Sequence, residues 1–407
     1  MRTIGNAKRH LAGIMSVLAL LLGATEAEAQ ISVKIGVLND RSGAYSEITG
    51  EGSVVAARMA VEDANLSSKG IQVEIVSADH QNKPDVGSTI VRQWFDRDGV
   101  DVVADLPTSS VALAVNEIVR QKNKIMLVSG GGTTELTGKS CSPNTVQWTY
   151  DSYSLTKGTA QTLVKQGGKN WFFITADYAY GISSETETIK FVTEAGGQIA
   201  GTVRAPFPTS DFSSYLLRAQ GSKADVIALA NAGTDTINTI KQSGEFGIVQ
   251  GGQKLAILLM LINDVKALGL PAAQGLVFTA ATYWDLSDET RAFSARFAAR
   301  HGGRMPNMVH AGVYASISHY LKAVAQKGTK DSASVMAAMK EMPTKDIFFG
   351  DGSVRADGRA MHDMYLVQVK TPTESKKDWD FYKILSRIPA EQAFRPIGEG
   401  GCPLVKN

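Results

Sequence analysis

The sequence lacks most of the patterns by which enzymes, metalloproteins and nucleic-acid-binding proteins are recognised. It contains no G-x-S-x-G nucleophile elbow, no Walker A motif, no G-x-G-x-x-G after its first strand and no H-E-x-x-H. Its six histidines are scattered, and none pairs with another ligand at the spacing of a metal site. The formal net charge is only +2, so electrostatics do not favour nucleic acid or an anionic membrane as a partner. We therefore expect no catalytic residue, no cofactor, no metal and no nucleic-acid partner.

Long apolar runs are also lacking, with one exception close to the N-terminus. The run Leu11–Ala24 follows a basic start, is too short to span a bilayer, and precedes the small-x-small pattern Ala27–Ala29. These features predict a cleavable secretory signal peptide over residues 1–29. The first residue after the predicted cleavage is Gln30 rather than cysteine, so a lipid anchor is not indicated. We expect an exported, soluble chain, most simply in a periplasm.

Cysteine is scarce, since the chain has only Cys141 and Cys402, both among Gly, Pro and Ser residues. In an oxidising compartment, two loop cysteines of a large exported protein are predicted to be bridged. Such a disulfide would join the C-terminal tail to a loop that precedes the middle of the chain. Two separate reduced thiols are the alternative, because sequence spacing cannot decide between the two states.

What the chain does contain is an alternation of apolar strands and helices that starts twice. The strands expected in the first series are Val33–Leu38, Ile71–Ala78, Val100–Ala104 and Ile125–Ser129. An aromatic and polar stretch at Gln147–Tyr153 then interrupts the alternation. The strands expected in the second series are Trp171–Thr175, Gln198–Val203, Val226–Ala230, Leu255–Leu261 and Leu276–Thr279. Unbroken apolar strands with helices between them are typical of parallel sheets covered on both faces, so we predict an α/β protein with two doubly wound parallel-sheet lobes.

The last part of the chain has a different composition. Three helices are expected at Thr290–Arg300, Val309–Lys327 and Ser332–Met342. The stretch Phe348–Asp363 is polar and rich in glycine, so it is predicted to be a loop or β-turn connection rather than packed core. Two apolar strands, Met364–Val369 and Phe381–Leu385, precede a tail rich in proline and glycine.

Two turns of similar design follow neighbouring strands of the first series. In the first, a helix opens on the hydroxyls of Thr108, Ser109 and Ser110. A helix start has free backbone N–H donors and a partial positive charge, so it suits an anionic group such as a carboxylate. The second turn, Gly130–Thr134, ends the next strand. The alternative is that a hydroxyl only caps the helix and that the glycines only make a flexible turn.

Several short motifs resemble those of one family in their order and spacing. The motifs are Ile35–Leu38 followed by Ser42-Gly43, Gly52 with Ala56, Asp79 followed by Pro84, Thr108–Ser110, Ser129–Thr137, Tyr180-Gly181 and Asp211–Ser213. The stretch Ser129–Thr137 looks like that family's S-P-G-A-T-x-x-L-T turn. From about Ser32 to Arg387, the chain resembles the branched-chain amino-acid (Leu/Ile/Val) type of periplasmic solute-binding protein.

The resemblance implies the type I periplasmic binding protein fold, in which two discontinuous lobes are joined by three hinge crossings. We expect these crossings near Gln147–Ser152, Val277–Trp284 and Gly350–Asp363. The expected segments are residues 30–148 and 284–350 for the first lobe, residues 149–283 and 363–390 for the second lobe, and residues 391–407 for the tail.

The resemblance also implies partners. We expect a monomer that captures a small molecule between its lobes, closes on it by hinge motion, and delivers it to the permease subunits of an ABC importer in the inner membrane. A soluble ligand sensor with the same fold is an alternative. An exported hydrolase is the alternative that the motifs favour least.

Individual site residues follow from the resemblance. Thr108, in the helix start that also contains Ser109, matches a hydroxyl that binds the ligand carboxylate. Gly131 and Thr133 match backbone and side-chain donors to the same group, and Tyr180 matches an aromatic residue of the second lobe that lines the cleft. Converging N–H and O–H donors suffice for one carboxylate without a formal positive charge.

Two positions depart from the amino-acid binders of this family. Ile262 stands where those proteins have an acidic residue that pairs with the ligand ammonium, and no aromatic residue occurs near Ala232-Gly233, where they have a tyrosine. A buried ammonium without an anionic partner loses on the order of several kcal/mol. We therefore expect a carboxylate with an apolar or aromatic body, such as an aromatic or short aliphatic acid. Asp235 or Asp264 could restore the pair, and the alternative ligand is then a branched-chain or other hydrophobic amino acid.

Aromatic residues that could line such a site are spread along the chain. They are Tyr45, Tyr150, Tyr180, Tyr283 and Trp284. Asp285, next to the last two at an expected crossing, is a further candidate for a ligand contact, and a hinge-surface carboxylate is the alternative. Taken singly, each of the aromatic residues is equally well explained by packing in the core or at a rim.

Overall fold

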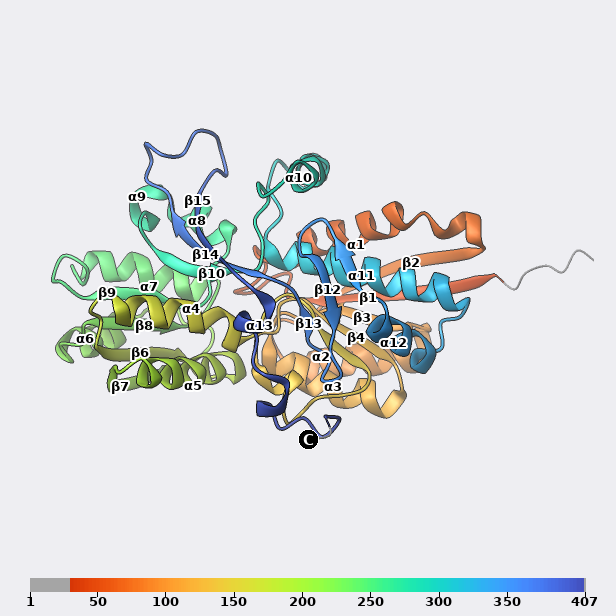
Figure 1. Ribbon diagram of the computed structural model, residues 1–407, viewed down its shortest axis with the longest axis horizontal. Helices are drawn as coiled ribbons and strands as arrows, with labels where there is room; N and C mark the ends of the chain where they lie inside the picture. Colours follow the sequence, from red (N-terminus) through yellow and green to blue (C-terminus); the bar gives the residue numbers. More distant parts are fainter. Residues whose placement is uncertain (1–29, 406–407) are drawn as a thin grey trace, which may run out of the picture.

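The computed structural model describes residues 30–405, so the predicted signal peptide lies outside the described residues. Two α/β lobes lie side by side and are joined at the middle of the molecule (Figure 1). Among residues 30–405, no helix combines the length and the apolar character that crossing a membrane requires.

The first lobe is built on a five-stranded parallel sheet in the order β2-β1-β3-β4-β5. Its strands are β1 (Ile31–Asn39), β2 (Ile71–Asp79), β3 (Val102–Asp105), β4 (Ile125–Val128) and β5 (Thr145–Gln147). Every residue of β3, β4 and β5 is buried. Alternate residues of β3 pack into different apolar clusters, Val102 and Ala104 into one and Val103 into the other. Burial on both faces is the physical reason for the unbroken apolar runs in the sequence.

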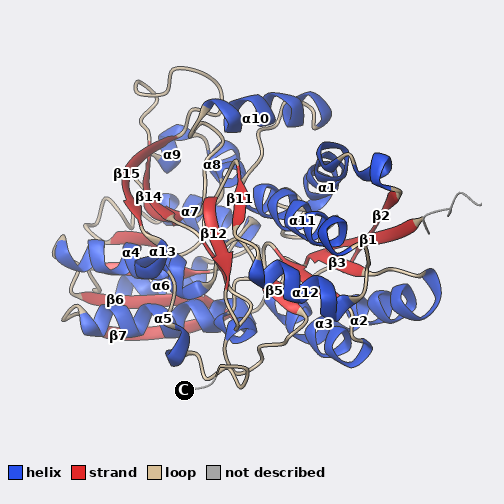
Figure 2. Ribbon diagram, turned by 45° about the vertical axis from the view of Figure 1, so that its right-hand side comes forward, coloured by secondary structure: helices blue, strands red, loops and turns tan. Residues whose placement is uncertain are grey.

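Helices cover both faces of this sheet. The helices of this lobe are α1 (Gly50–Ala64), α2 (Pro84–Gln93), α3 (Ser109–Lys122), α10 (Asp288–Arg300), α11 (Met308–Lys327) and α12 (Ser332–Glu341). Of these, α10 packs on α1, and α12 packs on α11 and on strand β12 (Gly350–Val354). Helices α1 and α11 lie on one face and helices α2 and α3 on the other (Figure 2). Single turns of 3-10 or π geometry occur at Leu66–Lys69, Trp94–Asp98, Thr134–Thr137 and Ile397–Glu399.

The second lobe combines a parallel and an antiparallel sheet. Its parallel sheet has the order β7-β6-β8-β9 and consists of β6 (Asn170–Ala176), β7 (Gln198–Ala205), β8 (Val226–Ala230) and β9 (Lys254–Ile257). The antiparallel strands are β10 (Val277–Ala280), β14 (Met364–Val369) and β15 (Tyr382–Ile388). The helices are α4 (Ser152–Lys165), α5 (Ala179–Glu194), α6 (Ser213–Gly221), α7 (Thr234–Glu245), α8 (Ile262–Leu268), α9 (Leu270–Ala273) and α13 (Ala390–Ala393). The two-lobed α/β fold class is confirmed, and these three strands lie where the sequence predicted strands, although it did not indicate their antiparallel pairing.

The polar stretch predicted to be a loop contains two strands instead. These are β12 (Gly350–Val354) and β13 (Ala360–Met361), which pair antiparallel and extend a ladder that begins at β11 (Thr344–Asp346). Most of β12 is exposed, so it has none of the apolar pattern by which buried strands are recognised. A Cβ atom on Gly352 would lie 2.0 Å from the Met361 carbonyl oxygen, so close strand pairing requires glycine there.

The predicted strand Leu255–Leu261 is too long at its C-terminal end. Strand β9 ends at Ile257, and the buried residues from Leu258 to Leu261 leave the sheet before α8 begins. Leu259, Met260 and Leu261 are buried at cavities between the lobes rather than by strand pairing, whereas Leu258 packs in an apolar cluster of the second lobe. An apolar run alone cannot distinguish these two kinds of burial.

The C-terminal tail is attached to both lobes. Cys141 and Cys402 form a disulfide with their Cα atoms 5.6 Å apart, which ties the tail to the first lobe. Lys157, on α4 of the second lobe, donates a hydrogen bond from Nζ to the carbonyl oxygen of Gln392 in the tail (2.8 Å).

Candidate functional site

Residues that directly follow the parallel strands of both lobes meet at a narrow cavity between the lobes. The cavity is almost closed, with a volume of only about 10 Å³, and four tyrosines line it: Tyr45, Tyr150, Tyr178 and Tyr180. The other lining residues are Ile48, Pro107, Gly130, Ala232, Leu259 and Val309. We call it the tyrosine cavity. Open α/β sheets bind ligands at this position, outside the carboxyl ends of their strands.

The four tyrosines come from different parts of the chain. The hydroxyls of Tyr45, in the first lobe, and Tyr178, at the start of α5, hydrogen-bond to each other across the lobes. Tyr150, at a hinge crossing, donates from its hydroxyl to the carbonyl oxygen of Gly130 (3.0 Å). The buried Tyr180 hydroxyl lies near Ser184 but makes no hydrogen bond of ordinary geometry with any described residue. Tyr180 thus offers an unused donor to the cavity.

The lobes are closed on each other around this cavity. In addition to the Tyr45–Tyr178 contact, the backbone N–H of Thr234 in the second lobe donates to the carbonyl oxygen of Ala44 in the first (3.3 Å). Burial raises the pKa of Tyr45, Tyr150 and Tyr178 well above the ordinary value of a phenol. These three hydroxyls are therefore neutral near pH 7 and remain able to donate.

Three buried carboxyl groups surround the tyrosine cavity. Burial raises the pKa of Asp105, Asp235 and Asp264 to about 7, and no basic side chain among the described residues pairs with any of them. Asp235 accepts a hydrogen bond from the backbone N–H of Thr209 (3.2 Å), and Asp264 accepts one from that of Leu261 (2.9 Å). All three therefore lack a cation among the described residues, and backbone N–H groups hold Asp235 and Asp264 in part.

Asp105 ends strand β3 in an unusual backbone conformation. Its φ angle is +83° and that of Leu106 is +50°, which places two consecutive non-glycine residues in the left-handed region. The Asn39 side chain donates to the Asp105 carboxylate (3.0 Å) and so holds the turn that leads to Pro107. Strain of this kind persists where surrounding contacts over-determine the backbone, and it clusters at functional sites.

The structure brings the two predicted turns together. The backbone N–H of Thr133 donates to the hydroxyl of Ser109 (3.1 Å), which joins the start of α3 to the glycine turn. The Thr108 hydroxyl donates to Asn82, and the Thr133 hydroxyl accepts from the N–H of Glu135 (3.3 Å). Neither Thr108 nor Thr133 is among the residues that line the tyrosine cavity, because both hydroxyls are used within the first lobe.

The glycine turn is closely packed rather than flexible. A Cβ atom on Gly132 would lie 2.9 Å from a ring carbon of Tyr180, and one on Gly131 would lie 2.9 Å from the carbonyl oxygen of Leu106. Among the described residues, no protein acceptor forms a hydrogen bond with the backbone N–H groups of Gly130–Gly132. The turn therefore presents free donors at the edge of the tyrosine cavity, which Gly130 lines.

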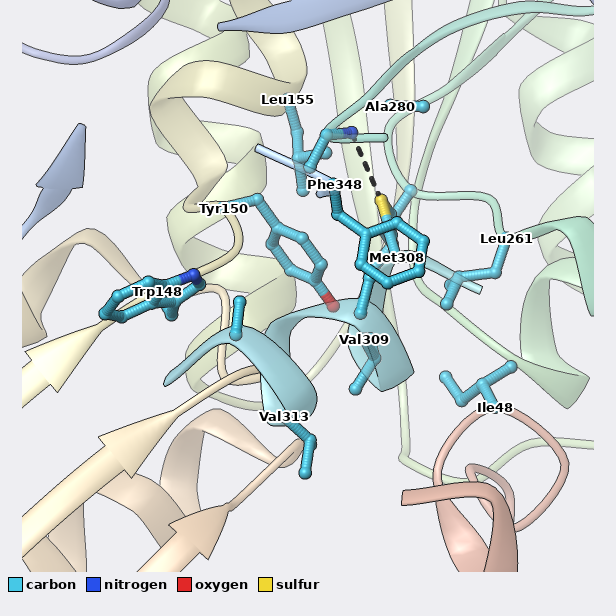
Figure 3. Packing of buried hydrophobic residues seen from close by; sticks show 14 of the residues in the cluster. Ile48, Trp148, Tyr150, Leu155, Leu261, Ala280, Met308, Val309, Val313 and Phe348 are labelled. Atoms are coloured by element: carbon cyan, nitrogen blue, oxygen red, sulfur yellow. Dashed lines mark hydrogen bonds between the residues drawn. The ribbon is translucent and has the colours of Figure 1, made fainter. Parts of the chain in front are cut away.

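Tyr283 and Trp284 lie in a second cavity at the hinge, which is also almost closed, with a volume of about 10 Å³. We call it the hinge cavity. Its lining includes Met260, Leu261, Tyr283, Trp284, Met308 and Tyr382. The Tyr283 hydroxyl (3.0 Å) and the Trp284 indole N–H (2.9 Å) both donate to the carbonyl oxygen of Trp379. The polar atoms of both side chains are therefore already hydrogen-bonded within the protein. Figure 3 shows the apolar packing around Met308 and Val309, where the two cavities approach each other.

Asp285 lies at neither cavity. Its carboxylate pairs with Arg291 (2.9 Å) and Lys377 (3.1 Å), and its side chain is 19% exposed. This geometry matches the hinge-surface carboxylate that we gave as the alternative. Among residues 30–405, no group of three or more His, Cys, Asp or Glu side chains is placed to hold a metal ion.

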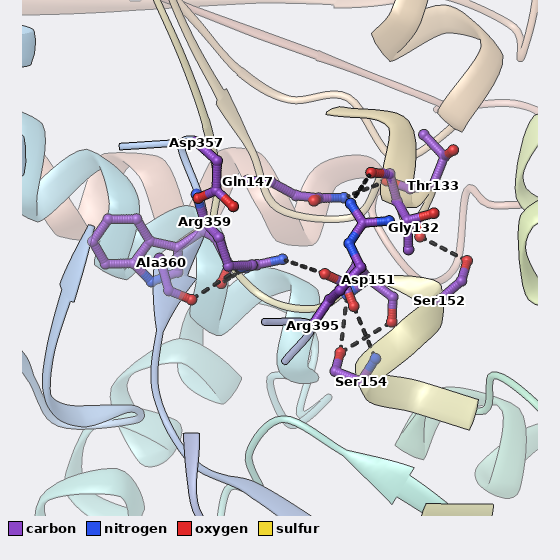
Figure 4. Close-up of polar contacts among 12 residues, drawn as sticks. Gly132, Thr133, Gln147, Asp151, Ser152, Ser154, Asp357, Arg359, Ala360 and Arg395 are labelled. Carbon is purple, nitrogen blue, oxygen red and sulfur yellow. Dashed lines mark hydrogen bonds and ion pairs between the residues drawn. The ribbon is translucent and has the colours of Figure 1, made fainter. Parts of the chain in front are cut away.

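A buried ion pair connects two of the hinge crossings (Figure 4). Asp151, which caps α4, lies 3.7 Å from the guanidinium of Arg359, and the two side chains are 3% and 0% exposed. Arg359 also donates to the carbonyl oxygens of Trp148 and Ala360. This cluster sets the relative position of the first and third crossings.

Sequence reasoning missed Tyr178, Ile48, Pro107, Leu259 and Val309 among the residues of the tyrosine cavity. Tyr178 directly follows β6 and precedes the first turn of α5, which is the same strand-to-helix position that drew attention to Thr108. The position of Tyr178 between a strand and a helix could therefore have identified it from the sequence. The aliphatic residues had none, because an aliphatic side chain in a cavity has the same sequence signature as one in the core.

Comparison with known proteins agrees with this architecture. A family model described as periplasmic binding protein matches residues 32–377. A periplasmic binding protein from Burkholderia mallei is 47% identical, with a TM-score of 0.90 over 92% of this chain and 99% of that chain. A branched chain amino acid ABC transporter periplasmic ligand-binding protein from Burkholderia xenovorans LB400 is 40% identical, with a TM-score of 0.81 over 91% of this chain and 99% of that chain.

A solute-binding protein of an ABC transporter from R. palustris, solved in complex with 4-hydroxybenzoate, shares the fold at lower identity. It is 23% identical, with a TM-score of 0.80 over 89% of this chain and 98% of that chain. Family and fold are thus those of transporter binding proteins rather than of enzymes. The chain belongs to the periplasmic binding protein family and is a periplasmic solute-binding protein of the branched-chain amino-acid (Leu/Ile/Val) type for ABC transport.

Proposed function

We propose that the protein captures a small carboxylate with an aromatic or apolar body in the tyrosine cavity and delivers it to the permease of an ABC importer. The lining of that cavity carries the proposal: it consists of four tyrosines and six apolar or glycine residues, with no charged side chain. Such a lining favours a ligand body that gains free energy by leaving water, and an aromatic body in particular.

Hydrogen-bond donors at the same edge support the carboxylate. Within the part of the chain that the structure describes, the N–H groups of Gly130–Gly132 lack acceptors and the Tyr180 hydroxyl makes no hydrogen bond of ordinary geometry. The start of α3 adds further N–H donors and a partial positive charge. Thr108, Ser109 and Thr133 complete the proposed cradle, and the two threonines would join it by exchanging their present partners for the ligand.

A hydrophobic amino acid is the second candidate, and Asp235 is the observation that favours it. This carboxyl group is buried beside Tyr45 and Tyr178 and has no basic partner, so it could pair with a ligand ammonium. The relative from Burkholderia xenovorans is named for branched-chain amino acids. The aromatic acid is preferred because the residues that line the cavity include no anionic group.

Calorimetric titration of the unliganded protein distinguishes the candidates. Benzoate and 4-hydroxybenzoate should bind with micromolar or lower Kd, while leucine, isoleucine and valine should not compete. Sub-micromolar binding of leucine without binding of either aromatic acid would replace the first candidate by the second. Mass spectrometry of a ligand released by denaturing the purified protein checks the same point independently.

Thr108→Ala tests the carboxylate cradle. The Thr108 side chain makes no capping hydrogen bond to α3, so the substitution leaves the helix start intact. We expect weaker binding of benzoate and an unfolding transition that stays cooperative, with a loss of about 1 kcal/mol of stability for the hydrogen bond to Asn82. Unaltered affinity would remove Thr108 from the cradle.

A further inference from the structure

The hinge cavity contains one polar group that the protein leaves without a partner. Thr282, Tyr283, Trp284 and Asn307 line this cavity, and each of them hydrogen-bonds to another protein group. Tyr382, on β15, belongs to the same lining, and its buried hydroxyl has no hydrogen-bond partner among residues 30–405. A buried hydroxyl without a partner is unfavourable, so native structures normally match such a group with a ligand or an ordered water.

The hinge cavity adjoins the tyrosine cavity. Met308 lines the first and Val309 the second, and the two residues are consecutive in the first turn of α11. In the same way, Leu259 lines the tyrosine cavity and Met260 the hinge cavity. Asp264 acts electrostatically on both Tyr150 in one cavity and Tyr382 in the other, so the two spaces also share this neighbour.

Met308 lies at the boundary between the two cavities. Its side chain packs with Tyr150, Leu261 and Phe348 in the cluster shown in Figure 3, and its sulfur accepts a hydrogen bond from the N–H of Ala281 (3.4 Å). Methionine is unbranched and has three rotatable bonds, so it adapts to a ligand at lower cost than a β-branched or aromatic residue.

We propose that the hinge cavity is the far subsite of the ligand site, that it takes the phenol end of an elongated aromatic acid, and that the Tyr382 hydroxyl hydrogen-bonds to that phenol. Met308 moves aside to admit this end and so determines the length of ligand that the protein accepts. This inference rests on the proposed function, because the carboxylate end of the ligand is placed in the tyrosine cavity.

A matched pair of ligands tests the role of Tyr382. In calorimetric titration, 3-(4-hydroxyphenyl)propanoate should bind wild-type protein about tenfold more tightly than 3-phenylpropanoate, because its phenol forms one hydrogen bond with the buried Tyr382 hydroxyl. Tyr382→Phe removes no hydrogen bond within the protein and should abolish this preference while leaving the binding of 3-phenylpropanoate unchanged. If the variant keeps the wild-type preference, water rather than ligand meets the hydroxyl and the proposal is wrong.

Tyr320→Phe is the control for this experiment. Tyr320 also has a buried hydroxyl without a partner, but it lies on α11 and lines neither cavity. The variant should retain the wild-type preference for the phenol. Loss of the preference in Tyr320→Phe as well would mean that removal of any buried hydroxyl has this effect, which would refute the assignment to Tyr382.

Substitutions of Met308 test the boundary. Met308→Ala should strengthen binding of 3-(4-hydroxyphenyl)propanoate relative to benzoate, and Met308→Phe should weaken it, each by about tenfold. Met339→Ala, at a fully buried position of α12, is the control and should leave the ratio unchanged. Equal changes for the long and short acids would overturn the proposal. Failure of benzoate to bind wild-type protein would instead refute the proposed function, so the two failures are distinguishable.

Discussion

Asp151→Asn is predicted to destabilise the protein by about 3 kcal/mol, because it leaves the buried Arg359 guanidinium without its carboxylate. The pair is separated by 3.7 Å, and side-chain exposures of 3% and 0% leave almost no solvent to screen the charge. Breaking one partner of a buried pair costs about 3–5 kcal/mol. We take the lower value because Arg359 keeps the carbonyl oxygens of Trp148 and Ala360 as acceptors and its contact with the ring of Phe394, whose centroid lies 4.6 Å away.

The free energy of unfolding in urea, followed by tryptophan fluorescence, measures this loss. Asparagine keeps the α4 cap, because its side-chain oxygen can still accept from the N–H of Ser154, as Asp151 does at 2.8 Å. The double variant Asp151→Asn with Arg359→Met removes both charges and should be more stable than Asp151→Asn alone by about 1–4 kcal/mol.

Two results would refute this reasoning about the hinge pair. One is a single variant whose free energy of unfolding lies within about 0.5 kcal/mol of wild type, which is the range of an ordinary surface substitution. The other is a double variant no more stable than Asp151→Asn, since that would show that the stranded guanidinium is not the cause of the loss.

Three further predictions address the glycine turn, the tail and a buried carboxyl group. Gly132→Ala should cost about 1–3 kcal/mol of stability and weaken ligand binding, because its Cβ would meet a tyrosine ring carbon at 2.9 Å. Gly221→Ala, where a Cβ meets nothing within 4 Å, is the control, and equal effects of the two on urea unfolding would contradict the steric argument. Replacing both Cys141 and Cys402 by serine should lower the free energy of unfolding by about 2–4 kcal/mol. Equal free energies of unfolding for the oxidised wild type and the serine variant would contradict this prediction. Burial raises the pKa of Asp264 to about 7. Between about pH 4 and about pH 7 the Asp264 carboxyl is therefore protonated in the folded state and ionised in the unfolded state. The contribution of this group to the stability of the wild type falls as pH rises through that window. Asp264→Asn should gain stability relative to wild type between about pH 4.5 and about pH 8 in urea unfolding, and a difference that does not change with pH would be evidence against the shift.

The parts of the fold that the sequence predicted are those in which burial leaves a continuous pattern. Strands such as β3 and β4 are buried on both faces, so their apolar runs were recognisable without any knowledge of their partners. Strand β12 was missed because it is largely exposed and held by antiparallel pairing, for which a polar sequence leaves no periodic signal.

Some of the candidate site residues come together as the sequence indicated, and their role in ligand binding stays a prediction. Tyr45, Tyr150 and Tyr180 do meet at the tyrosine cavity, and Ser109 does contact Thr133. Tyr283 and Trp284 were expected in the same site but lie in the hinge cavity. Sequence position places a residue at a crossing, but it does not indicate to which side of the hinge the ring turns.

The sequence by itself determined the α/β class, the repetition that makes two lobes, and the order of motifs that identifies the family. These properties follow from local patterns, because burial, helix starts and turns depend on residues close together in the chain. Only the tertiary structure decided which hydroxyls remain free. The Thr108 hydroxyl donates to Asn82, whereas those of Tyr180 and Tyr382 have no partner among the described residues, and these differences arise from contacts between segments far apart in sequence. Hydrogen bonding is directional and short-ranged, so a hydroxyl's partner is known only when the lobes have been placed against each other.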